Sequence, residues 1–89
     1  MKFSSIPDVA ADLKKGKMII VVDDADRENE GDLIVAAEHI SAANVNFMAK
    51  HGRGIICVPM EGPRLEELGV DLMVANNQDD LKTAWTVSI

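Results

Sequence analysis

The stretch that most limits how this chain can fold is DDADRENEGD at residues 23–32, directly behind the apolar run at 18–22. A second apolar run, at 33–37, follows it at once. Short β-branched runs bounded by glycine and acidic residues are typical of buried strands. The sequence therefore predicts strands at 17–22 and 33–37, with the acidic stretch forming a loop between them.

The negative charge of the chain is concentrated in this loop. The chain has 15 acidic and 9 basic side chains for a net charge of −6, and residues 23–32 hold six of the acids and one arginine. An even acidic coat would indicate solubility or disorder. A concentrated one behind a strand indicates a place that holds a cation or handles protons.

The rest of the chain alternates helical and extended patterns. Ser5 and Ser41 are candidate N-caps, and glycines stand where the helices should stop. Helices are expected behind Ser5 as far as Gly16, behind Ser41 as far as the HGRG at 51–54, and at 63–68. Further strands are expected at 55–58 and 84–89, with a polar loop at 75–82. This order of elements predicts an α+β or α/β domain, and we take α+β as the fold class.

Length and composition exclude several classes of protein. With 89 residues the chain is one small domain at most, and its core is expected to be marginal. No apolar run is long enough to span a bilayer, and no basic stripe suits nucleic acid, so neither a membrane nor a nucleic acid is an expected partner. A single cysteine, Cys57, cannot form an internal disulfide, which fits a reducing, cytoplasmic location.

The loop has the chemistry of a divalent-cation site. Glu28, Glu30 and Asp32 alternate along the chain, so in an extended segment they would point to one side. Three such carboxylates repel one another unless a cation such as Mg²⁺ is bound among them. Crowding also raises carboxyl pKa values, which suits proton transfer, and Arg27 adds a planar cation suited to a phosphate.

Two simpler interpretations compete with this one. The order from Asp26 to Gly31 imitates the start of an EF-hand loop, but the twelfth position is Ala37, where a bidentate Glu is required. A solvated acidic turn is the other interpretation, and charge and spacing alone leave it open.

The order of residues in DDADRENEGDLIVAAE at 23–38 closely resembles the signature of the 3,4-dihydroxy-2-butanone 4-phosphate synthase family. The resemblance continues through HGRGIICVPM at 51–60, LMVANN at 72–77 and TAWTVSI at 83–89. It implies a layered α/β/α fold and a riboflavin-pathway lyase that converts D-ribulose 5-phosphate into 3,4-dihydroxy-2-butanone 4-phosphate and formate. It also implies Mg²⁺ or Mn²⁺ as cofactor and a homodimer.

The same resemblance implies a role for each matching residue. Glu28 is the metal ligand, and Arg27 and Asp32 contact the sugar phosphate, with Glu28 and Asp23 also expected to face the substrate. Glu30 and Asp32 belong to the acid/base set. Cys57 is a candidate beside the active site, although cysteines in apolar strands are more often inert core thiols.

The resemblance covers only the N-terminal part of such a synthase domain, at residues 1–89. The family's second half supplies a metal-binding histidine, a phosphate-binding segment and a further glutamate, so the chain alone is expected to be inactive. A non-catalytic acidic module for metal binding or protein interaction remains the alternative. A fused GTP cyclohydrolase II domain lies beyond what the sequence decides.

Overall fold

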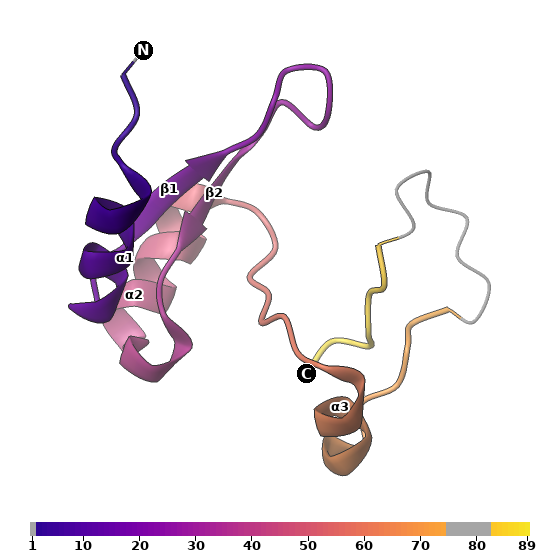
Figure 1. The fold of residues 1–89 in the computed structure, drawn as a ribbon. Coiled ribbons are helices and arrows are strands. Elements are labelled where there is room, and N and C mark those ends of the chain that lie inside the picture. Colours follow the sequence, from indigo (N-terminus) through magenta and orange to yellow (C-terminus); the bar gives the residue numbers. More distant parts are fainter. Residues whose placement is uncertain (1, 75–82) are drawn as a thin grey trace. The chain divides into compact units, whose positions relative to one another are not determined.

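The computed structural model describes residues 2–74 and 83–89 and divides the chain into two units, Met1–Val58 and Pro59–Ile89. The first unit contains helix α1, the strands β1 and β2, and the helical segments η1, α2 and η2 (Figure 1). The second contains helix α3.

Helix α1, Ile6–Lys14, begins where the sequence predicts. The Asp8 N–H donates to Ser5 Oγ over 3.3 Å, which satisfies one of the free donors of the first turn. Pro7 lies in that first turn, where its missing N–H costs nothing. Gly16 follows the helix at φ +79°, a backbone conformation that glycine adopts without strain.

Strands β1, Ile19–Val22, and β2, Gly31–Ile34, form an antiparallel pair in which Ile19 lies opposite Ile34 and Val22 opposite Gly31. The loop at 23–30 joins them at the end of the hairpin away from α1 and α2 (Figure 1). The prediction of two strands flanking the acidic loop is confirmed. The bounds differ: β2 begins at Gly31 and stops before Val35, because a strand extends only as far as its partner pairs with it.

The helical segments after β2 follow the predicted order. The short η1, Ala37–His39, precedes α2, Ala42–Phe47, which Ser41 and Asn44 cap reciprocally: each backbone N–H donates to the other's side-chain oxygen over 3.1 Å. The π-helical η2, Met48–Gly52, continues it. The helix stops at Arg53, at φ +60°, within the predicted HGRG.

In the second unit, α3, Gly62–Leu68, confirms the helix predicted at 63–68. Gly69 closes it at φ +68°. Beyond it, one isolated antiparallel bridge joins Leu72 to Thr86. The polar loop predicted at 75–82 lies outside the described residues.

The strands predicted at 55–58 and 84–89 are wrong. Residues 55–58 have no regular secondary structure, and 84–89 contain only the bridge at Thr86. An apolar, β-branched run gives the side chains of a strand, but its backbone N–H and C=O groups also need a neighbouring strand. Within the described residues, the only named strands are β1 and β2.

None of the described residues is fully buried. Ile20 is 70% exposed, Ile55 77% and Trp85 45%, all large apolar side chains of the kind that normally fill a core. Residues 2–74 and 83–89 include no helix of the length and hydropathy needed to cross a membrane. The fold is α+β, as predicted, and it is a partial domain.

Candidate active-site loop

The acidic loop is shaped by its own backbone. The Asp23 N–H donates to the Glu30 carbonyl over 3.3 Å, next to the last strand pair, Val22 and Gly31. The Asp24 carbonyl accepts from the N–H groups of Arg27, at 3.0 Å, and Asn29, at 3.3 Å. Asn29 has φ +53°, a left-handed conformation that asparagine tolerates better than most residues.

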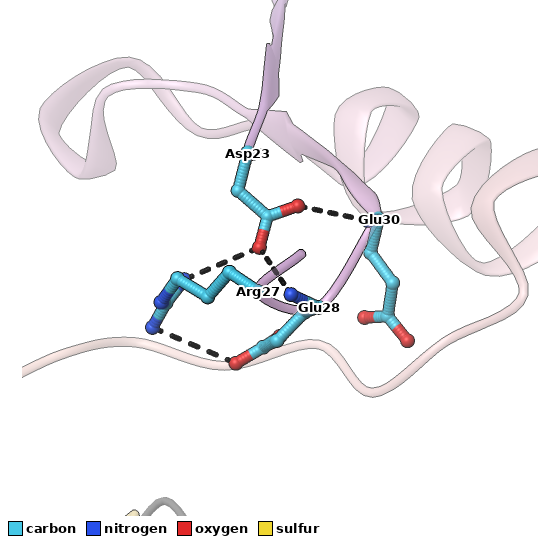
Figure 2. Close-up of polar contacts among 4 residues, drawn as sticks. All are labelled: Asp23, Arg27, Glu28 and Glu30. Carbon is cyan, nitrogen blue, oxygen red and sulfur yellow. Dashed lines mark hydrogen bonds and ion pairs between the residues drawn. The ribbon is translucent and has the colours of Figure 1, made fainter. Parts of the chain in front are cut away.

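The Asp23 carboxylate lies at the centre of the loop (Figure 2). Its Oδ1 accepts from the Glu30 N–H and its Oδ2 from the Glu28 N–H, both over 2.9 Å. Oδ2 also accepts from Arg27 Nη1 at 3.3 Å. These backbone N–H groups, that of Glu30 first and then that of Glu28, lower the pKa of Asp23 below its ordinary 3.8, and the Arg27 charge adds to the effect.

Arg27 lies between two carboxylates. Its Nη1 is 3.3 Å from Asp23 Oδ2 and its Nη2 is 3.6 Å from Glu28 Oε1. The Arg27 side chain is nevertheless 63% exposed. A planar guanidinium held at one edge and open to solvent is suited to bind an incoming oxyanion.

The loop does not place Glu28, Glu30 and Asp32 on one extended face, so that prediction is wrong. Glu28 ends a turn, and the left-handed Asn29 interrupts the extended backbone. Figure 2 shows Glu28 reaching back to Arg27 while the Glu30 side chain points away from Asp23. Asp32 lies in β2, opposite Val21.

Cys57 is not in a strand and not in a core. The thiol is exposed and lies 3.5 Å from the Ile55 carbonyl, which is its one hydrogen-bond partner in the described part of the chain. No ion pair involves the thiol among the described residues. Among the described residues, no hydrogen bond or ion pair joins Cys57 to the loop at 23–30.

The described residues contain no cluster of three or more His, Cys, Asp or Glu side chains that could hold a metal ion on its own. Mg²⁺ often needs only one or two protein carboxylates, because it keeps several waters and binds substrate oxygens. Glu28 and Glu30, both on the exposed loop, are of the right chemical type. The loop fits a hard cation as a partial ligand set.

Sequence reasoning expected Asp23 to face the substrate and did not foresee that its carboxylate accepts hydrogen bonds from the loop backbone. The sequence nevertheless contains a signal for these hydrogen bonds. An aspartate at the end of a strand, followed within a few residues by an asparagine and a glycine, is typical of a loop closed by side-chain to backbone hydrogen bonds.

Comparison with known proteins identifies the class to which this hairpin and loop belong. The family model described as 3,4-dihydroxy-2-butanone 4-phosphate synthase matches residues 7–89. The chain belongs to this family. The resemblance stated from the sequence is thereby confirmed.

Individual relatives agree with the family match. A 3,4-dihydroxy-2-butanone 4-phosphate synthase of Pseudomonas aeruginosa is 49% identical over 100% of this chain, and one of Agrobacterium fabrum is 48% identical over 100%. The chain covers 24% and 42% of those two proteins. It thus spans less than half the length of either relative.

A solved structure agrees as well. The crystal structure of a 3,4-dihydroxy-2-butanone 4-phosphate synthase in complex with two magnesium ions superimposes with a TM-score of 0.88 at 44% identity. The match covers 97% of this chain and 40% of that one.

Proposed function

We propose that residues 1–89 form the N-terminal portion of a synthase domain that converts D-ribulose 5-phosphate into 3,4-dihydroxy-2-butanone 4-phosphate and formate. The observation that carries the proposal is the loop between β1 and β2, where Arg27, Glu28 and Glu30 are gathered around one carboxylate. Family membership over residues 7–89 supports it.

Substrate binding is assigned to the cationic and acidic edge of the loop. Arg27 contacts the phosphate of the sugar, for which its exposed guanidinium provides a fork of N–H donors. Glu28 and Asp32 face the sugar. Asp32 extends from β2, so its position is set by the strand pair and not by the loop.

Glu28 is the metal ligand among these residues. Its carboxylate is a hard oxygen donor that suits Mg²⁺ or Mn²⁺, with the remaining positions taken by water, by substrate or by other parts of the enzyme. A bound divalent cation supplies Lewis-acid stabilisation of developing negative charge on substrate oxygens. The complex of a family member with two magnesium ions supports a divalent cofactor.

Proton transfer is assigned to Glu30 and Asp32. The conversion removes and returns protons at several carbons and releases formate, so it needs carboxylates that can accept and donate protons beside the sugar. Glu30 has no hydrogen-bond or ion-pair partner for its carboxylate among the described residues, so it is free to take this role. Cys57 assists near the site without forming a covalent intermediate.

The proposed enzyme is a cytoplasmic homodimer that acts on a small molecule and binds neither nucleic acid nor membrane. The exposed apolar side chains of both units support further burial against another chain or chain segment.

The test uses the whole protein that carries these 89 residues. Purified protein is incubated with D-ribulose 5-phosphate, and formate is followed with and without Mg²⁺, with a chelator as control. Formate release that depends on the metal supports the proposal. Metal binding without formate release would instead favour a non-catalytic acidic module.

A further inference from the structure

We propose that Asp23 is a positioning residue of this active site, whose carboxylate holds the loop that presents Arg27, Glu28 and Glu30. The inference rests on the proposed function for what those three side chains do. It concerns how they are held, and it differs from the expectation that Asp23 itself contacts the substrate.

The contacts of Asp23 reach across most of the loop. Its two oxygens accept from the N–H groups of Glu28 and Glu30, five and seven residues further along the chain, both over 2.9 Å. Its own N–H donates to the Glu30 carbonyl at 3.3 Å. Asp23 therefore fixes both the beginning and the end of the segment that carries the functional side chains.

Asn29 lies between Glu28 and Glu30, whose N–H groups donate to Asp23, and its backbone conformation explains why the loop needs these hydrogen bonds. Asn29 has φ +53°, a conformation that a non-glycine residue adopts at a cost. Hydrogen bonds on either side, at Glu28 and Glu30, keep the chain in it. This backbone reversal points the Glu28 and Glu30 side chains in different directions (Figure 2).

The Asp23 side chain is less exposed to solvent than the side chains of Arg27 and Glu28. The Asp23 side chain is 21% exposed, against 38% for Glu28 and 63% for Arg27. Both Asp23 oxygens already accept hydrogen bonds from the protein. Asp23 thus lies behind the surface that Arg27 and Glu28 present to solvent.

Aspartate is the side chain that fits this task. Asparagine has one acceptor oxygen and would set its NH₂ group against a backbone donor, whereas glutamate keeps the charge but is one methylene longer. Asp23→Asn and Asp23→Glu therefore both disturb the geometry, and only the first removes the charge. Asp26→Asn is the matched control, because the Asp26 side chain has no hydrogen bond or ion pair among the described residues.

The experiment measures hydrogen exchange of the Glu28 and Glu30 amides in the whole protein, without substrate or added metal. Both Asp23 variants should exchange these amides about tenfold faster or more, as expected for loss of hydrogen bonds to a charged group. Asp26→Asn should leave them unchanged. Unchanged exchange in Asp23→Asn, or wild-type exchange in Asp23→Glu, would overturn the inference. Asp23→Glu gives the same readout should Asp23→Asn not fold.

Steady-state kinetics provide a second readout. A positioning role predicts that kcat falls in both variants, because Glu28 and Glu30 lose their placement. A rise in KM alone, with amide exchange as in the parent, would make Asp23 a direct substrate ligand instead. If the parent protein itself releases no formate, the proposed function fails, while the exchange result still decides the role of Asp23.

Discussion

Glu28 and Glu30 lie two residues apart in the chain, yet the structure gives them different surroundings. The Glu28 carboxylate is 3.6 Å from Arg27 Nη2, whereas the Glu30 side chain points away from Asp23 (Figure 2). The Glu28 carboxylate therefore has a cationic partner, whereas the Glu30 carboxylate has no hydrogen bond or ion pair among the described residues.

Glu28→Gln is expected to weaken Mg²⁺ or Mn²⁺ binding of the whole protein by about tenfold or more, because a hard cation loses an anionic ligand. Formate release should fall by orders of magnitude. The melting temperature without metal should stay unchanged or rise, since the lost ion pair with Arg27 is exposed and contributes little. Calorimetric titration, the formate assay and thermal melting measure the three effects.

The control for this change is Asp26→Asn, which removes one negative charge from the same loop without removing a contact among the described residues. It should bind metal almost as the parent does. If Glu28→Gln also bound metal and released formate like the parent, Glu28 would not be the metal ligand.

Cys57→Ser should leave measurable activity in the whole protein. The thiol is exposed, and its hydrogen-bond partner among the described residues is the Ile55 carbonyl, an acceptor that a serine hydroxyl also satisfies. The free energy of unfolding should change by no more than about 0.5 kcal/mol. Complete loss of formate release, with an unchanged melting curve, would show instead that the thiol is essential.

At the scale of the element, the hairpin loop should respond to acid. The pKa of Asp23 is lowered in the folded loop, chiefly by the N–H groups of Glu30 and Glu28. The ionised Asp23 carboxylate therefore contributes its full share of loop stability above about pH 3.8, its ordinary pKa. It is lost as the pH falls below that value through the lower folded pKa.

Amide exchange or chemical shifts of Glu28 and Glu30, followed in the whole protein from about pH 6 to about pH 2, should therefore show the loop intact until about pH 4 and loosening below it. Asp23→Asn should abolish this transition. A loop that loosened near neutral pH would contradict the account, because Asp23 is ionised throughout that range.

The cap of α2 provides a second prediction at this scale. Ser41→Ala removes the Oγ that accepts from the Asn44 N–H at 3.1 Å, and loss of such a cap costs about 1 kcal/mol. Thermal or denaturant unfolding of the whole protein measures it. Ser4→Ala is the control, because Ser4 caps nothing among the described residues, and an equal effect of both changes would exclude a capping role.

At the scale of the whole molecule, the prominent feature is exposed apolar surface. No described residue is fully buried, although 47% of the sequence is hydrophobic. A domain is stabilised mainly by apolar area removed from water, so residues 1–89 by themselves are expected to be marginally stable at best.

The purified 89-residue chain should therefore release no formate from D-ribulose 5-phosphate with Mg²⁺. Its described residues contain no cluster of three or more His, Cys, Asp or Glu side chains that could hold a metal ion, and none of them is fully buried. The chain should also bind a hydrophobic dye and unfold without a sharp transition. Formate release by this chain alone would refute the expectation that the rest of the synthase is required.

Local signals predicted those elements whose stability is decided locally. Ser5 and Ser41 as caps and Gly69 as a helix end are each explained by hydrogen bonds or backbone freedom within a few residues, so the positions of α1, α2 and α3 could be predicted. The acidic loop between two strands could also be predicted, because its charge cannot be buried in a strand.

The strands predicted at 55–58 and 84–89 are wrong because a strand forms only where another segment of the chain pairs with its backbone. Ile19–Val22 is a strand because Gly31–Ile34 pairs with it, whereas the equally apolar 55–58 has no such partner among the described residues. A pattern of side chains does not say which backbone will lie alongside, and this is decided only in the folded chain.

The sequence by itself identified the family, because the long segment at 23–38 resembles the family's signature and the family model matches residues 7–89. It also predicted Arg27, Glu28, Glu30 and Asp32 as site residues. Only the tertiary structure decided how they are arranged. The left-handed Asn29 and the two N–H groups bound by Asp23 separate Glu28 from Glu30. The reason is that backbone reversal depends on hydrogen bonds across seven residues, which periodicity along the chain does not specify.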